Sequence, residues 1–380
     1  MRPVFRPAPL SFGLMATLLS TAALAEVPRV ATDIAPVHSL VAQVMQGLGE
    51  PSLIVQPGAS PHGYSMRPSE ARALNEADLV VWVGEALTPW LEGPIETLGE
   101  GAGKIELMSV EGTILYDYRE GATFGSHDHA HGEDGHAEHD DHDHGKDDHA
   151  KHDDHDHDHG EAKADDHDHD HDHDHDHDHD HDHGHAKDEA KDHDHDHGEK
   201  ADGHAGHDHA GHDSHAWLDP MNARLWLGVI AAELARLDPE NAAKYAANAA
   251  AGQADIDALQ AEIASMLAPV SDKGFVVFHD AYQYFERRFD LAAAGSITLS
   301  DASAPSAGRI AELRDAVATM GASCVFAEPQ FDKRLIDTVF ADSARVGLLD
   351  PLGQDIAPGA GLYPQMMRAM AASFATCLEG

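Results

Sequence analysis

A histidine- and aspartate-rich tract interrupts this chain and limits what can fold around it. Residues 126–214 contain 29 of the 33 histidines, 33 acidic residues and 6 lysines, a formal charge of −27 out of −43 for the whole chain. Residues 166–183 alternate Asp and His without a break. The tract has almost no large apolar residues, so burial cannot offset the ~1–2 kcal/mol per residue that ordering a backbone costs. We therefore expect a disordered, solvated loop that contributes nothing to a core.

The histidines of the tract indicate metal association. Neutral imidazole is a favoured ligand of zinc, copper and nickel. A run that only kept the protein soluble would need charge but no histidine. Because the repeat encodes no fixed geometry, we expect many weak, exchangeable sites and no single tight one. The expected auxiliary ligands include those of the alternating run: His167, His169, His171, His173, His175, His177, His179, His181 and His183.

The first 25 residues have the pattern of a secretory signal. Arg2 and Arg6 precede an apolar run at residues 10–19, and Ala23-Leu24-Ala25 fits the small-residue cleavage pattern. We therefore expect cleavage after Ala25, with no cysteine nearby to carry a lipid anchor. No later run reaches the ~20 apolar residues of a membrane helix. The prediction is an exported, periplasmic protein.

Outside the tract, strand-like and helix-like segments alternate, which predicts parallel sheets in an α/β fold. We expect two lobes, each with a small, mainly parallel sheet flanked by helices, joined by one long rigid helix. The predicted division is a signal at 1–25, a first lobe at 26–238 that contains the 126–214 loop, a linking helix at 239–268 and a second lobe at 269–380. The expected strands are 29–32, 52–56, 79–83, 105–108, 275–278, 323–327 and 345–349. The expected helices are 36–44, 67–77, one from 88, 220–237, 239–267, 281–288, 305–320, 335–341 and 363–377.

The chain has two cysteines, Cys324 and Cys377, both in the expected second lobe. In an oxidising compartment one disulfide is the favoured interpretation, and two buried free thiols are the alternative.

Four histidines lie outside the tract. His279 directly follows a strand-like run, at the end where open α/β sheets hold ligands. His62 lies in a turn-rich loop after another strand, and His215 lies where ordered sequence resumes. Together with Asp350, which also follows a strand, these three could meet in a cleft between the lobes as a tetrahedral zinc site. Each alone could equally be an ordinary hydrogen-bonded histidine, which is our interpretation of His38, on the polar side of an amphipathic helix.

At these residues the sequence resembles a known family, the zinc-specific periplasmic solute-binding proteins of ABC importers (ZnuA type). The resemblance covers nearly all of the mature chain except the tract. The matching segments are 57–69 (PGASPHGYSMRPS), 77–84 (ADLVVWVG), 215–220 (HAWLDP), 278–282 (FHDAY), 326–331 (FAEPQF) and 349–353 (LDPLG).

The resemblance implies that His62, His215 and His279 bind zinc in the cleft, and that Asp350 faces the site, either as a ligand or as a carboxylate behind the ligands. Manganese-type relatives have Glu where His279 stands, so His here favours zinc. The family also implies the long linking helix and the disulfide between Cys324 and Cys377.

Two positions depart from the family pattern. Some members have Glu just before the first ligand, where this chain has Pro61, and many have Asp just after it, where this chain has Gly63. Proline cannot be a ligand, so we expect water or Asp350 in the fourth position.

The expected function is high-affinity capture of Zn²⁺ and its delivery to the membrane permease of an ABC importer by a monomer that is not an enzyme. The tract would collect zinc at low affinity. The alternatives are a free-standing zinc buffer or chaperone, and an importer protein for Ni, Co, Cu or Mn. A zinc hydrolase would need a general base, for which Asp280, Glu328 and Asp350 are candidates, but no catalytic motif accompanies them. The absence of a basic patch argues against nucleic acid as a partner.

Overall fold

The computed structural model describes residues 26–119, 124, 211–298, 307–320, 322–329, 340 and 344–380. The predicted signal segment, most of the tract with its alternating run, and the helix expected at 335–341 apart from Phe340 lie outside the described residues. Among the described residues, no helix is long and apolar enough to cross a membrane.

The first sheet has four parallel strands in the order β2-β1-β3-β4. All four residues of β3 are buried, because helices cover both faces of a parallel sheet. The strands are β1 (Val30–Thr32), β2 (Ser52–Leu53), β3 (Leu79–Trp82) and β4 (Gly103–Glu106), and the helices among them are α1 (Ala35–Val44), α2 (Pro68–Asn75) and α3 (Pro89–Thr97). All three helices have a proline in the first turn, where its missing N–H costs no hydrogen bond.

The second sheet also has four parallel strands, in the order β6-β5-β7-β8. Its strands are β5 (Phe275–His279), β6 (Ala293–Thr298), β7 (Cys324–Ala327) and β8 (Arg345–Leu348), and its helices are α6 (Gln283–Arg288), α7 (Ala307–Met320) and α9 (Leu362–Glu379). Two parallel sheets flanked by helices confirm the predicted fold class.

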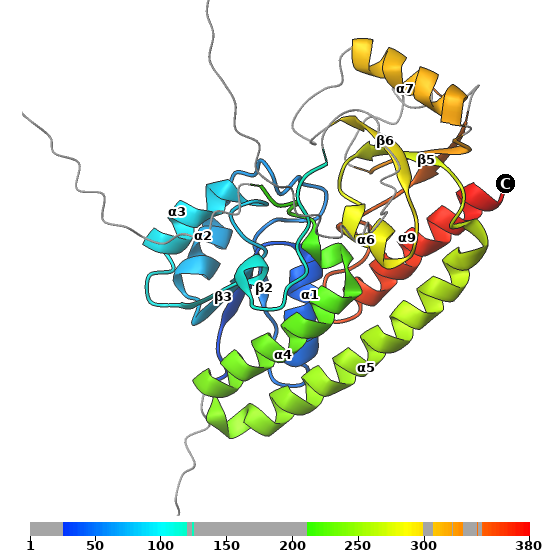
Figure 1. Cartoon of the computed structure of the whole chain (residues 1–380). Helices are drawn as coiled ribbons and strands as arrows, with labels where there is room; N and C mark the ends of the chain where they lie inside the picture. Colours follow the sequence, from blue (N-terminus) through cyan, green and yellow to red (C-terminus); the bar gives the residue numbers. More distant parts are fainter. Residues whose placement is uncertain are drawn as a thin grey trace, which may run out of the picture. The chain divides into compact units, whose positions relative to one another are not determined.

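A long helix, α5 (Ala242–Leu267), links the two sheet regions (Figure 1). It follows α4 (Pro220–Leu237) after a 3₁₀ turn at Pro239–Asn241, and it contacts α4, α1 and α9. Its buried stripe includes Ile256, Leu259 and Ile263, spaced to face one side of a helix. The long linking helix is thus confirmed, although its first turn is 3₁₀ instead of α-helical.

One apolar core is continuous across both sheets. It contains Val81 from β3, Leu259 from α5, and Phe275 and Phe326 from the second sheet. Sliding one sheet region far from the other would expose part of this core to water, at ~25 cal/mol for each Å² of apolar surface. The packing therefore favours small movements around the linking helix over wide hinge opening.

A disulfide joins Cys324, on β7, to Cys377, on α9. It closes a sequence separation of 53 residues and ties the last helix to the second sheet. The predicted pairing is confirmed, and the alternative of two free thiols is wrong.

Three elements differ from the sequence-based expectation. Strand β2 is only two residues long, because the backbone bends at Ile54 and Val55, although their N–H groups still donate to the carbonyls of Thr32 and Asp33. Strand β4 starts at Gly103, and Leu107–Ser109 form a 3₁₀ turn where a strand was expected. Strand β6 was not predicted, because the Ala-Ala-Gly-Ser sequence at its start has little intrinsic β propensity.

Asp33, at the end of β1, is fully buried and accepts two backbone hydrogen bonds, from Ile34 and Val83, each at 2.7 Å. Burial raises the pKa of Asp33 to about 7. In the unfolded chain the Asp33 carboxyl loses its proton near its ordinary pKa, at a lower pH than in the folded protein. The contribution of Asp33 to stability is therefore full below about pH 4 and is lost as the pH rises through about 7.

We expect the urea midpoint of the metal-free protein to fall between pH 5 and 7.5, and to fall less steeply in Asp33→Asn. The variant should be less stable overall, because its amide would face the Val83 N–H. Urea unfolding with a chelator at several pH values measures both slopes. Equal slopes in the two proteins would rule out titration of Asp33 in this range.

Candidate metal centre

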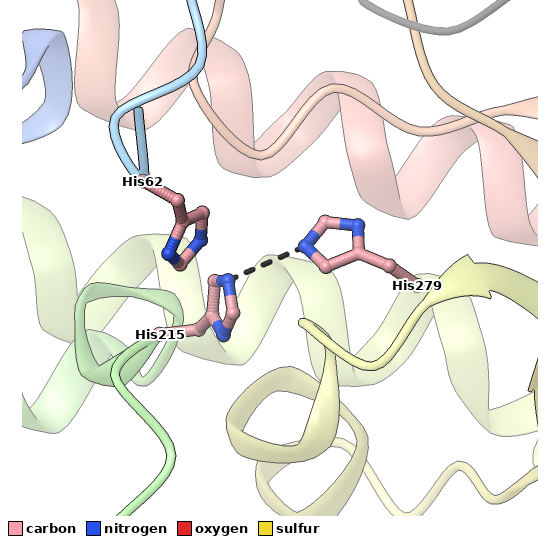
Figure 2. Close-up of side chains that lie close together, drawn as sticks. All are labelled: His62, His215 and His279. Carbon is pink, nitrogen blue, oxygen red and sulfur yellow. Dashed lines mark hydrogen bonds between the residues drawn. The ribbon is translucent and has the colours of Figure 1, made fainter. Parts of the chain in front are cut away.

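Three histidines that are far apart in the sequence meet at one point. His62 comes from the loop between β2 and α2, His215 directly precedes the 3₁₀ turn at Ala216–Leu218, and His279 is the last residue of β5. One ring nitrogen of each lies within 4.8 Å of the others, and Figure 2 shows the three rings directed toward one another. His215 and His279 are buried, whereas His62 is partly exposed.

The local chain explains how each ring is held. The loop that carries His62 is held at Pro61, whose backbone carbonyl accepts a 2.7 Å hydrogen bond from the Trp90 indole. The His215 ring packs against Trp217 at 5.3 Å between centroids. His279 ends a central strand, where the parallel sheet directs side chains toward a ligand edge.

Two buried carboxylates each form a hydrogen bond with the Nδ1 atom of one of the rings. Asp213 accepts from Nδ1 of His215 at 2.7 Å and from its backbone N–H at 3.0 Å. Glu328, just after β7, accepts from Nδ1 of His279. Both carboxylates are about 1% exposed. Metal-binding histidines typically donate their second ring nitrogen to a carboxylate in this way, which fixes the tautomer and the ring orientation.

The Nε2 edges of these two rings face each other. Nε2 of His215 and Nε2 of His279 are 3.3 Å apart. When Asp213 and Glu328 are ionised, both Nδ1 atoms carry the protons, so in neutral rings both Nε2 atoms present lone pairs. Two lone pairs at this distance repel each other, and either a proton on one Nε2 or a metal ion bound by both removes that repulsion. Two nitrogens bound tetrahedrally to zinc at ~2.0–2.1 Å would lie about 3.3–3.4 Å apart, which matches the observed separation.

The burial of Asp213 also favours a cation beside it. Burial raises the pKa of Asp213 to about 7, because the folded protein withdraws its charge from water. A dication bound to His215 would favour the ionised form of this carboxylate.

Asp350 is engaged in its own loop. Its carboxylate accepts from the backbone N–H groups of Leu352, Gly353 and Gln354 at 3.1, 2.9 and 2.6 Å. Among the described residues, the group whose ligand atoms lie within 4.8 Å of one another contains the three histidines and not Asp350. Asp350 is still near the centre, since its charge contributes to the raised pKa of Tyr282, whose ring lies 6.3 Å from that of His279. Its role as a fourth ligand stays a prediction.

His38 is outside the group and is an ordinary hydrogen-bonded histidine, as expected, although its side of the helix is covered. It is buried on α1, and its Nε2 lies 3.0 Å from the carbonyl of Pro51. The helix packs between the sheet and other helices, so even its polar positions are covered.

The three candidate bases for a hydrolase are all engaged. Asp280 is paired with Arg119, Glu328 with His279, and Asp350 with backbone N–H groups. None of these three carboxylates is held ready to activate a water molecule.

Sequence reasoning missed the roles of Asp213 and Glu328. Asp213 is one of 33 acidic residues in the tract, and only its position two residues before His215 distinguishes it. Residues 211–214, which the predicted loop included, belong with the compact body, and Asp213 and Ser214 are buried. Glu328 is 49 residues from His279, so no local pattern connects them.

Comparisons with known proteins agree on one family. Residues 30–377 match the family described as "Zinc-uptake complex component A periplasmic". The chain is 44% identical over 351 residues to the high-affinity zinc uptake system protein ZnuA of Brucella suis biovar 1, covering 92% of this chain and 91% of that one. It is 45% identical over 370 residues to the protein of that name from Paracoccus denitrificans, covering 96% and 97%. A solved structure titled "Crystal structure of ZnuA" has the same fold, with a TM-score of 0.62 at 20% identity, covering 92% of this chain and 99% of that one.

Proposed function

Because this chain belongs to the periplasmic component A family of zinc-uptake complexes, we propose that it captures zinc with His62, His215 and His279 and delivers it to the permease of an ABC importer. The observation that carries the proposal is the pair of facing Nε2 atoms, 3.3 Å apart, with a carboxylate behind each ring. Relatives are named for zinc uptake and not for a reaction, so the protein is a transport component and not an enzyme. The name "uptake system" likewise favours a permease partner over a free-standing buffer.

The chain acts in the periplasm, as the family description says. Export by residues 1–25, cleavage after Ala25 and a monomeric state are further parts of the proposal. So is the division into a first lobe at 26–238, a linking helix at 239–268 and a second lobe at 269–380.

Zinc would bind the three neutral imidazoles, with water or Asp350 in the fourth position. Protons compete for the same nitrogens, so affinity should fall as the pH drops through the range where imidazoles become charged. The continuous core around α5 allows only small shifts on loading. The tract would supply weak sites that raise the local zinc concentration.

We expect removal of residues 128–205 to leave one tight zinc site with an unchanged Kd. This deletion keeps residues 211–214, and with them the Asp213 that holds His215. Isothermal titration should show one tight event plus weaker ones in the full chain, and only the tight event in the deletion. His62→Ala in the deletion background is the control that should weaken the remaining event. A folded deletion protein that binds no zinc tightly would contradict this division of labour.

A further inference from the structure

The two ends of the tract are joined where they meet the body of the protein. We define the insertion roots as residues 116–119 and 211–213. The backbone N–H of Tyr118 donates to the carbonyl of Gly211 at 3.2 Å, and that of Asp213 donates to Tyr116 at 2.8 Å. An antiparallel bridge between Asp117 and His212 completes the pair.

The insertion roots are fastened to α6 of the second sheet region. The Tyr284 hydroxyl accepts from the Tyr116 N–H at 3.1 Å and donates to the Asp213 carbonyl at 2.8 Å. The Gln283 amide donates to the Asp117 carbonyl at 3.0 Å. One tyrosine and one glutamine therefore tie both roots to the segment that follows His279.

Arg119 makes the strongest of these connections. Its guanidinium donates to both oxygens of Asp280, with Nε at 3.0 and 3.1 Å, and to both oxygens of Glu286 at 2.8 and 2.9 Å. The side chains of Arg119, Asp280 and Glu286 are 17%, 6% and 3% exposed, and the Phe124 ring lies 3.9 Å from the guanidinium carbon. Charge-assisted bonds shielded from water in this way are among the strongest a side chain can make.

Each root is connected by a hydrogen bond to one ligand of the candidate centre or to the residue next to it. Asp213, in the second root, holds His215. Asp280, bound by Arg119 in the first root, is the residue after His279. The position of one ring relative to the other therefore depends on the contacts that join the two roots to each other and to α6.

We propose that Arg119 is a positioning residue of the metal centre, which holds the segment after His279 against the roots that carry Asp213 and so sets the spacing of the two facing imidazoles. The inference rests on the proposed zinc site. A purely structural arginine would stabilise the protein without affecting the geometry of bound metal.

The sharpest variant is Arg119→Lys, which keeps the positive charge but cannot donate from three nitrogens to two carboxylates in a fixed fork. The matched control is Arg288→Lys. Arg288, on α6, makes a two-pronged ion pair with Asp219 at 2.8 and 2.7 Å, and Asp219 in turn caps α4 through the Met221 N–H. Asp280→Asn is the second test variant if Arg119→Lys does not fold.

Two measurements separate positioning from stability. Competition with a chromophoric chelator gives the zinc Kd, and the visible absorption of bound Co²⁺ reports the coordination geometry. We expect Arg119→Lys to weaken zinc binding by about 10-fold, the lower end for outer-shell residues of metal sites, and to alter the Co²⁺ bands. Arg288→Lys should retain the parental values of both.

If Arg119→Lys and Arg288→Lys lose similar thermal stability while both keep the parental Kd and Co²⁺ spectrum, the inference is wrong and Arg119 is structural. If the unmodified protein itself binds zinc weakly and gives the spectrum of hydrated Co²⁺, the proposed function fails, and the inference fails with it.

Discussion

Replacing His279 with asparagine should weaken zinc binding by more than about 100-fold while the protein stays folded. The asparagine amide can occupy the position of Nδ1 and donate to Glu328, so the buried carboxylate keeps a partner. What is lost is Nε2, which faces Nε2 of His215 at 3.3 Å. Loss of an outer-shell partner alone typically costs ~10–100-fold in metal affinity, so loss of a ligand should exceed that range.

Chelator competition on the deletion protein lacking residues 128–205 measures this effect without zinc held by the tract. His38→Gln is the matched control, because His38 is also buried and its Nε2 lies 3.0 Å from a carbonyl that a glutamine amide can reach. The control should bind zinc as tightly as the parent. Parental affinity in His279→Asn, with an unchanged circular dichroism spectrum, would remove His279 from the metal centre.

Removing the disulfide should lower stability by about 4 kcal/mol in the chain-entropy model. The cross-link spans 53 residues and restricts the unfolded chain over that length, and its loss also loosens α9 from β7. For a folded body of this size we expect a decrease in Tm of roughly 10 °C. Thermal unfolding of Cys324→Ala/Cys377→Ala beside the parent measures the change.

The two cysteines are the only ones in the chain, which provides an internal control. Dithiothreitol should lower the Tm of the parent toward that of the double variant and leave the variant unaffected. Zinc affinity of the folded variant should be unchanged, because the disulfide is not part of the metal centre. Two reactive thiols in the denatured, unreduced parent would contradict the cross-link.

Much of the fold follows from local patterns in the sequence. The apolar run at β3 predicts a strand buried on both faces, and the stripe of Ile256, Leu259 and Ile263 predicts a helix with one buried side. These signals are local because the periods of strands and helices are set within a few residues. Strand β6 escaped prediction because its small residues are held in the sheet by pairing with β5 and not by their own propensity.

The three histidines could be selected from the sequence because each adjoins a strand end, a loop or a recognisable motif. Their partners could not. Glu328 reaches His279 across 49 positions, and Arg119 reaches Asp280 across 161. Nothing in the composition separates Asp213 from the acidic residues that precede it.

By itself, the sequence determined that the chain is an α/β protein interrupted by a tract that cannot form a core, and which histidines stand at strand ends. Only the tertiary structure decided which carboxylate supports each ring, that the Nε2 atoms of two rings face each other, and that the roots of the tract are fastened beside them. The physical reason is that hydrophobic periodicity is written into neighbouring residues. The tautomer and the orientation of an imidazole depend instead on hydrogen bonds with residues that only folding brings within about 3 Å of the ring.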